Sequence, residues 1–274
     1  MTPVRGQAYA PAKLLLDAVF CLILPIVLLR PHLPGLPGGL TGIIGPVPAY
    51  LTASLIPVTY ILIGLLRHRH ANTLTLMAAG SAVLAGALAF VPVSGVAFAV
   101  KDSSGSLFLL AVTTASLLLG RPFAAALLRV TLMPDTPGRA ARLDALLQEP
   151  TMTRAVVTAT RVLQLKAVTV ASLNILVKVH IVTAPFGTGA FNAQLADATA
   201  RMIPLAWLAS AVSYPAVTAL LARALRRQTG VKTLPLGRAF WHALEHGSVD
   251  DTPSRSGSAA GDREPVIPGR PARK

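Results

Sequence analysis

Six apolar runs, separated by short polar or basic stretches, dominate the pattern of the chain. A helix needs about 20 mostly apolar residues to cross the ~30 Å hydrocarbon core of a bilayer, because each residue advances the helix by about 1.5 Å. Six segments come close to this length. The pattern therefore predicts an all-α, polytopic membrane protein with about six transmembrane helices, over residues 14–29, 43–66, 73–91, 103–120, 162–184 and 202–222.

The first run also has the outline of a secretory signal peptide, because Arg5 and Lys13 precede it. Two features favour a retained helix instead. The run contains Asp17, and it is followed by Arg30 rather than by a small-residue cleavage site. We expect this helix to stay attached to the protein.

The composition agrees with membrane insertion. Of 274 residues, 53% are hydrophobic and 13% are charged, against roughly 25% charged in an average soluble domain. The mean hydropathy is +0.60. These values argue against a soluble globular domain, a disordered chain and a coiled coil. Cys21 is the only cysteine, so no intrachain disulfide can form.

The basic residues give an orientation. The net charge is +14, from 25 Lys and Arg against 11 Asp and Glu. With six spans, the N-terminus, the second loop, the fourth loop and the C-terminus lie on one side and carry nearly all of this charge, whereas the other three loops carry Arg30, Lys101 and Arg201. Basic loops stay in the cytoplasm. Both termini are therefore predicted to be cytoplasmic, in the inner membrane of a cell.

The position of the basic residues also indicates their partner. They flank apolar runs, so anionic lipid headgroups fit them better than nucleic acid. The His residues of Arg67-His68-Arg69-His70 leave a pH-sensing role open as an alternative. The predicted headgroup anchors are Arg67, Arg69, Arg223, Arg226 and Arg227.

Three segments are predicted to lie outside the six-helix membrane domain (14–222). Residues 1–13 form a cytoplasmic N-terminus, 223–246 a basic cytoplasmic helix, and 247–274 a disordered tail that lacks large apolar residues. The long connection between the fourth and fifth spans contains Leu143, Leu146 and Leu147 at helical spacing. This pattern fits either an amphipathic helix on the membrane surface or a solvated connector.

No catalytic constellation is visible. His242-Ala243-Leu244-Glu245-His246 matches the H-x-x-E-H pattern of inverted zinc peptidases. A catalytic zinc also needs a third protein ligand, and the acids that follow lie in the tail predicted to be disordered. We therefore expect no zinc, no cofactor and no enzyme activity.

Polar residues inside the spans are better candidates for a function, because an ionisable group in the membrane rarely persists without a partner or a task. Lys166, Asn174 and Lys178 fall within about 120° on one helix, which fits either a polar pathway or structural pairing. Asp17 is predicted at the same depth as Lys166, so we expect these two to pair, with Arg161 as substitute.

Other polar residues mark helix ends. Residues 92–100 stay apolar but carry Pro92 and Gly95, which suggests a helix end and an interfacial segment. Lys101 and Asp102-Ser103-Ser104 follow, and the latter three suggest an N-cap of the fourth span. Gly120-Arg121-Pro122 fits the end of that span.

The quoted segments resemble one known family. "KLLLDAVFCLILPIVLL", "RHRHANTLTL", "AFAVKDSSGSLFLLAVTTASLLLGRPF" and "LNILVKVHI" are similar to segments of the bacterial intracellular septation protein A-like family, as a distant relative or sister group. This resemblance implies a small multi-pass inner-membrane protein linked to the cell envelope.

Two functions follow as hypotheses. The first is an envelope-associated structural or interaction protein with a membrane-protein partner or a second copy, because Ala78, Ala82 and Gly86 are spaced for close helix packing. The second is a small-molecule or ion transporter that uses Asp17, Lys166 and Lys178.

Overall fold

The computed structural model describes residues 15–33, 36–37, 39–67, 73–231 and 237–246. Apart from the two-residue antiparallel strands β1 (His32–Leu33) and β2 (Leu36–Pro37), its regular elements are helices. The first helix covers Leu15–Leu29 and contains a π-helical turn, η1 (Val19–Ile23), before α2 (Leu24–Leu29). The other helices are α3 (Gly39–Ile44), α4 (Pro46–Arg67), α5 (Thr73–Ala89), α6 (Gly95–Asp102), α7 (Ser104–Leu118), α8 (Phe123–Leu132), α9 (Pro137–Gln148), α10 (Pro150–Ile181), α11 (Gly189–Thr229) and α12 (Gly237–His246).

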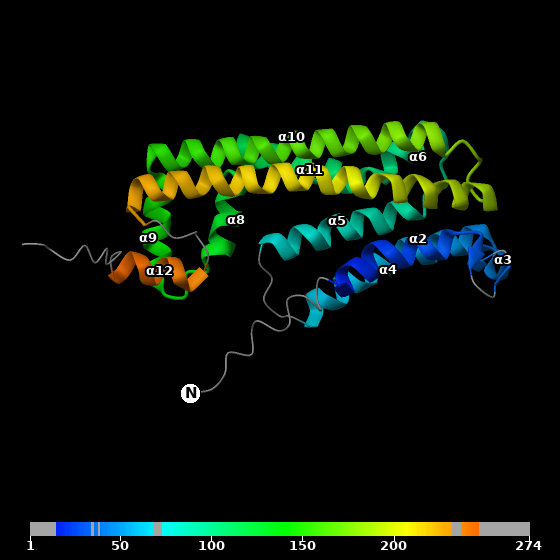
Figure 1. The fold of residues 1–274 in the computed structure, drawn as a ribbon, viewed down its shortest axis with the longest axis horizontal. Coiled ribbons are helices and arrows are strands. Elements are labelled where there is room, and N and C mark those ends of the chain that lie inside the picture. Colours follow the sequence, from blue (N-terminus) through cyan, green and yellow to red (C-terminus); the bar gives the residue numbers. More distant parts are fainter. Residues whose placement is uncertain (1–14, 34–35, 38, 68–72, 232–236, 247–274) are drawn as a thin grey trace, which may run out of the picture.

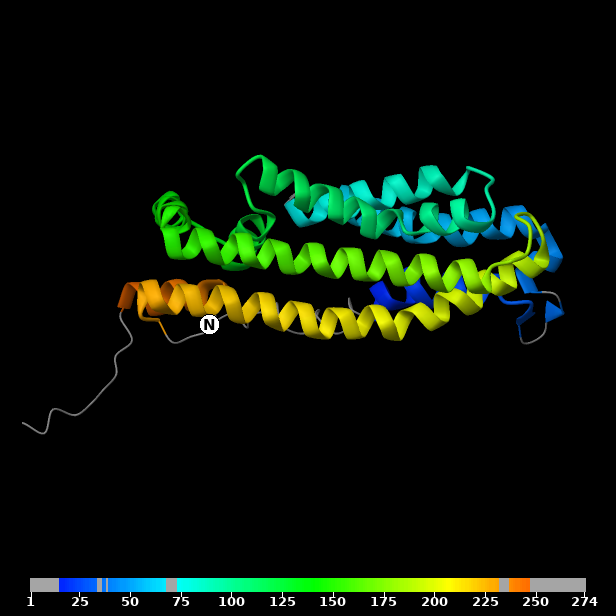
Figure 2. The ribbon, with the colours of Figure 1, turned by 90° about the horizontal axis from the view of Figure 1, so that it is seen from above.

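The long helices alternate in direction along an elongated bundle (Figure 1). Helices α10 and α11 lie side by side along its whole length, and α8, α9 and α12 gather at one end (Figures 1 and 2). We call α8, α9, α12 and the adjoining turns of α10 and α11 the cap. The opposite end, which contains α3 and α6, is called the far end.

Three helices are long and apolar enough to cross a membrane, namely α4, α10 and α11. A fourth crossing results if α6 and α7, which meet at an angle of 56°, count as one broken span. The first helix and α5 are apolar but shorter in the described part of the chain. The structure thus bears out a helical protein with several membrane-spanning candidates at the predicted positions.

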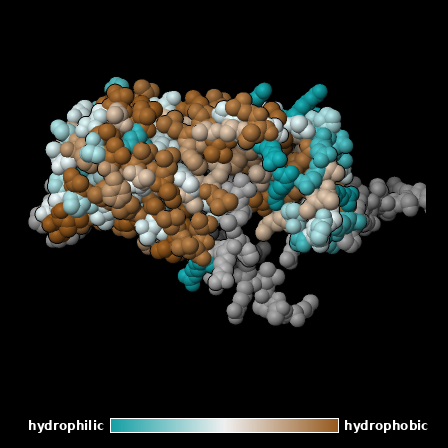
Figure 3. All heavy atoms as spheres, turned by 180° about the vertical axis from the view of Figure 1, so that it is seen from behind, coloured by the Kyte–Doolittle hydropathy of each residue, from teal (hydrophilic) through white to brown (hydrophobic). Residues whose placement is uncertain are grey.

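The surface supports this arrangement. Viewed from behind, the long part of the bundle is covered mostly by apolar residues, whereas hydrophilic residues gather over the cap (Figure 3). Large apolar side chains such as Leu118, Leu66 and Leu165 are more than 60% exposed. Side chains of this kind face lipid readily and water poorly.

The two longest helices extend beyond their predicted spans. Helix α10 begins at Pro150 rather than residue 162, and α11 covers 41 residues rather than 202–222. Proline at the first turn and Thr188 at the N-cap explain where they start. At about 1.5 Å per residue they measure about 48 and 61 Å, so each is longer than a bilayer core is thick.

The cap corrects two expectations. The predicted basic helix over 223–246 is not one helix, because residues up to Thr229 complete α11, Gly230 ends it in a left-handed conformation, and α12 begins only at Gly237. The long connection forms α8, α9 and the start of α10. Leu143 of α9 is 1% exposed in the cap core, so this residue of the amphipathic helix packs on protein, not on lipid.

The cap core draws on distant parts of the sequence. It joins α8, α9, α12 and the ends of α10 and α11 through buried residues that include Leu132, Leu143, Met152, Leu225, Phe240 and Trp241. The Trp241 indole Nε1 donates to the Leu132 carbonyl oxygen at 2.7 Å. Met133 ends α8 with a φ of 44°.

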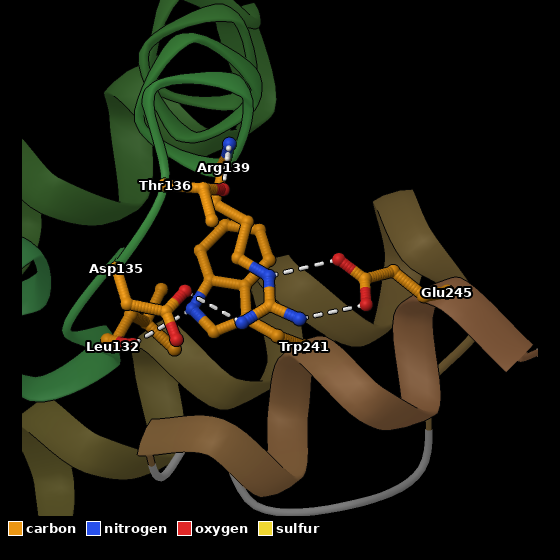
Figure 4. A network of polar contacts seen from close by, with 6 residues as sticks. All are labelled: Leu132, Asp135, Thr136, Arg139, Trp241 and Glu245. Carbon is orange, nitrogen blue, oxygen red and sulfur yellow. Dashed lines mark hydrogen bonds and ion pairs between the residues drawn. The ribbon is translucent and has the colours of Figure 1, made fainter.

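Arg139 holds α9 to α12 at the cap surface (Figure 4). Its guanidinium donates to both Glu245 carboxylate oxygens, at 2.8 and 2.7 Å, and to Asp135 at 2.6 Å. These hydrogen bonds raise the pKa of Arg139 above its usual value, and the contribution of Glu245 is larger than that of Asp135. The Arg139 guanidinium also lies 5.8 Å from the Trp241 ring centroid, so the ion pair closes over the cap core.

Small residues bring α5 close to its neighbours. Ala82 is 7% exposed, and a Cβ at Gly86 would lie 3.2 Å from a methyl group of Val58 on α4. A Cβ at Gly80 would lie 3.0 Å from the Phe108 ring on α7. Ala82 and Gly86 thus serve packing within this chain, whereas Ala78 is exposed.

Candidate functional site

The break between α6 and α7 is built into the interior of the far end. Lys101 and Ser103 are 9% and 2% exposed there. The Ser103 amide donates to the carbonyl oxygens of Ala99 and Val100, and its hydroxyl donates to the Ala99 carbonyl at 2.9 Å. Backbone groups at such a break must be satisfied within the protein, because lipid offers them no partner. Lys101 is therefore buried in the last turn of α6 and does not lie in an exposed loop.

The expected N-cap is present in position only. Ser103 occupies the N-cap position of α7, but its side chain makes no capping hydrogen bond. Asp102 is the last residue of α6, and its carboxylate accepts a hydrogen bond from Lys178 instead. The end of α7 agrees with prediction: Gly120 is left-handed, with a φ of 66°, and the Arg121 amide donates to the Ser116 carbonyl at 2.8 Å.

Asp102 is the partner of the buried lysine on α10. The Lys178 ammonium donates to Asp102 Oδ2, and the Lys178 side chain is 4% exposed. One turn earlier, the Asn174 amide donates to Ser103 Oγ at 2.9 Å and to Asp102 Oδ2 at 3.4 Å. Asn174 and Lys178 share a helix face because they are four residues apart. This polar contact joins α10 to the α6–α7 break.

Lys101 lies beside this pair in an aromatic setting. Its ammonium donates to the Val91 carbonyl oxygen at 2.8 Å. The centroids of the Tyr50 and Phe98 rings lie 5.3 Å away, and that of Phe186 lies 5.6 Å away. Ring faces attract a cation at such distances. Within the described chain, no carboxylate lies within ion-pair distance of Lys101.

A cavity of about 480 Å³ adjoins the break. Its polar end contains Lys101, Asp102 and Ser104, and its apolar walls come from α4 and α5. The volume lies within the range usual for small-molecule sites. At the formal charges of its side chains, the Lys101–Asp102–Lys178 cluster has one excess positive charge. The arrangement suits the binding of an anion better than acid–base or nucleophilic chemistry.

The structure separates Asp17 from Lys166. The Tyr60 hydroxyl donates to Asp17 Oδ1 at 2.7 Å, whereas the Lys166 ammonium donates to the Tyr214 hydroxyl at 2.8 Å. The predicted pair is therefore wrong. The prediction rested on equal depth alone, but the first helix packs on α4 and α11, whereas α10 packs on α11, α7 and α6. A polar route through Asp17, Lys166 and Lys178 is not continuous for the same reason.

These partners predict a pattern of energetic coupling. Asp17→Asn and Tyr60→Phe should be non-additive by about 0.5–3 kcal/mol, because the first removes the charge of the acceptor and the second the donor of the same hydrogen bond. Asp17→Asn and Lys166→Gln should instead add to within about 0.5 kcal/mol. Unfolding of the purified single and double variants in detergent measures both. Coupling confined to Asp17 and Lys166 would contradict the contacts seen here.

The predicted headgroup anchors fall at exposed positions where they are described. Arg67 ends α4, and Arg223, Arg226 and Arg227 lie exposed on the last turns of α11. A surface hollow of about 540 Å³ includes Tyr214, Arg223 and Arg226. Arg121 is exposed after α7. Arg69, His68, His70, residues 1–13 and the 247–274 tail lie outside the described residues.

The H-x-x-E-H segment forms α12 of the cap. Glu245 is engaged by Arg139 (Figure 4), and the His246 side chain lies outside the described residues. Among the described residues, no group of three or more His, Cys, Asp or Glu side chains is placed to hold a metal ion.

The α6–α7 site was only half visible in the sequence. The spacing along one helix indicated Asn174 and Lys178, whereas Asp102 was expected only as part of an N-cap and Lys101 only as the basic residue of a loop. The packing of α4, α6 and α10 brings these four residues together. It also places the rings of Tyr50, Phe98 and Phe186 around Lys101. Comparison with models of known protein families, with curated proteins and with solved structures found no match to this chain.

Proposed function

We propose that the protein is a transporter of small molecules whose chain crosses a bacterial inner membrane six times, with the cap in the cytoplasm. The alternating direction of the helices supports this topology (Figures 1 and 2). So do the exposed arginines near the cap end. In this topology the far end, with α3 and α6, lies toward the outside.

The observation that carries the proposal is the Lys101–Asp102–Lys178 cluster at a helix break next to a cavity. Both lysines are buried, and the Asp102 side chain is 28% exposed. Irregular backbone at membrane depth occurs where it lines a cavity, and broken helices are a common way for transporters to build a substrate site. Ionisable groups there mark substrate pathways by default. A purely structural role would require the charges but not the cavity.

Reporter fusions test the topology. Fusions after residue 70 and after residue 250 are expected to report from the cytoplasm, because basic residues flank both positions. A fusion near Phe191, at the far end, should report from outside. Equal reports from residues 70 and 191 would exclude six crossings.

Cysteine labelling tests transport without knowledge of the substrate. In a Cys21→Ser background, Ser104→Cys places one thiol at the polar end of the cavity, where Ser104 is 5% exposed. A membrane-impermeant methanethiosulfonate should label it in both right-side-out and inside-out vesicles, because a transporter opens its site to each side in turn. Thr113→Cys, at a position 0% exposed on the same helix, is the control and should stay unlabelled.

Labelling of Ser104→Cys from one side only would replace the transporter by a binding protein. Labelling from neither side would remove a solute-binding role and favour the envelope-associated interaction role. The cap supports that second candidate, since it places a folded helical surface outside the apolar bundle (Figure 3). Co-purification of a membrane protein or a second copy through the cap would then be expected.

A further inference from the structure

Lys101 is the buried charge that the α6–α7 cluster leaves uncompensated. Asp102 already accepts from Lys178 and Asn174. Lys101 is 9% exposed, and its ammonium is held by one carbonyl oxygen and by the faces of aromatic rings. A buried ammonium without a counter-ion is costly. A ligand with a negative charge would supply the counter-ion that the described residues do not provide.

The cavity beside Lys101 has a second, apolar character. Away from its polar end, its walls include Val58 and Ile61 of α4 and Ala78, Ala82, Ala85 and Leu88 of α5. The small side chains of α5 leave room for an occupant. An apolar chain fills such walls favourably, at roughly 25 cal/mol for each Å² removed from water. A purely hydrophilic anion would leave them unfilled.

We propose that the cavity binds an amphipathic anion, with its single acidic group at Lys101 and its apolar chain between α4 and α5. This inference rests on the proposed function and names the substrate class of the same site. The excess positive charge of the cluster disfavours amphipathic cations. A neutral amphiphile of the same length leaves Lys101 without a counter-charge.

Competition binding tests the class of ligand. The full-length protein in nanodiscs of neutral lipid is saturated with dansyl-undecanoate, and matched twelve-carbon compounds compete for it. Dodecanoate is expected to compete about ten- to a hundredfold better than dodecanol or dodecylamine, because a hydrogen bond to a charged group contributes that difference. Acetate, which lacks the chain, should not compete.

Lys101 variants test the position of the acid group. Lys101→Met should abolish the preference for dodecanoate over dodecanol, and Lys101→Arg should keep part of it because the charge remains. Lys166→Met, the matched lysine control on α10, should keep all of it. Removal of an uncompensated buried charge should not lower thermal stability, so a folded Lys101→Met protein is expected, and its melting temperature checks this. If Lys101→Met does not fold, the preference for dodecanoate is compared between Lys101→Arg, which should keep part of it, and Lys166→Met, which should keep all of it.

Two results would overturn the inference: equal competition by the acid, the alcohol and the amine, or an unchanged acid preference in Lys101→Met. Two-sided labelling of Ser104→Cys together with either result would leave the transporter in place and remove only the ligand class. One-sided labelling together with acid-selective binding would keep the ligand class and replace the transporter by a binding protein. An amphipathic anion of this kind could be a membrane lipid or a free acid, and a lysophosphatidate with a twelve-carbon chain separates the two. It should compete better than dodecanoate if the ligand is a membrane lipid, and less well if the ligand is a free acid.

Discussion

Asp102→Asn is expected to lower the free energy of unfolding by about 3–5 kcal/mol, which is the usual cost of leaving a buried charge without its partner. Asparagine keeps the shape of the side chain but not its charge. The Lys178 ammonium, 4% exposed, would then lack a counter-ion beside Lys101, which is also buried. Denaturation of the purified protein in mixed micelles, followed by circular dichroism, measures the loss.

Two further variants make this prediction specific. The double variant Asp102→Asn, Lys178→Met should recover most of the stability, because replacing a buried pair by apolar residues is often neutral. Asp144→Asn, which breaks the exposed pair with Arg129 (52% and 54% exposed), should cost about 0–1 kcal/mol. Equal losses for Asp102→Asn and Asp144→Asn would show that Lys178 does not depend on its carboxylate partner.

Trp241→Ala is expected to destabilise the cap by about 3–5 kcal/mol, as large-to-small changes in a core do. Trp241 is 0% exposed, packs against Phe240 with ring centroids 5.3 Å apart, and donates to the Leu132 carbonyl. Its loss removes the main contact of α12 with α8. Hydrogen exchange should then accelerate in α8, α9 and α12, and not at the α6–α7 break.

Trp207 provides the control for this experiment. Trp207 lies on α11 and is 62% exposed, so Trp207→Ala should leave exchange in the cap unchanged. Trp241→Phe should fall between the two, because it keeps an aromatic ring but leaves the Leu132 carbonyl without its indole donor, at a cost of about 1–3 kcal/mol. Unchanged exchange in Trp241→Ala would mean that α12 does not hold the cap together.

Hydrophobic run length was enough to locate the long apolar helices and their neighbours. It did not give their ends. Arg154 and Arg161 lie inside α10, and Arg223 lies inside α11, because a helix continues wherever its backbone is satisfied, whether its side chains meet lipid or water. The apolar part of the sequence indicates which residues could cross a membrane, whereas the helix itself continues beyond that part.

Contacts between helices were harder to predict than the helices themselves. Depth in the membrane can be estimated from position along a span, which led to the pairing of Asp17 with Lys166. The order of helices around the bundle cannot be obtained in this way, and it gave these residues Tyr60 and Tyr214 as partners instead. Arg139 and Glu245 are 106 residues apart, and no local pattern indicates that they meet.

The length of α11 has a mechanical consequence. Its 41 residues make a shaft of about 61 Å, anchored at the far end where the Asn192 amide donates to the Pro46 carbonyl at 2.8 Å. A rotation of about 10° around that anchor would displace the other tip by about 10 Å. Pro204 and Pro215 interrupt the hydrogen-bond ladder of the shaft and are the points where it bends most easily. In the proposed topology, a small change in the tilt of α11 would therefore move its cap end much further than its far end.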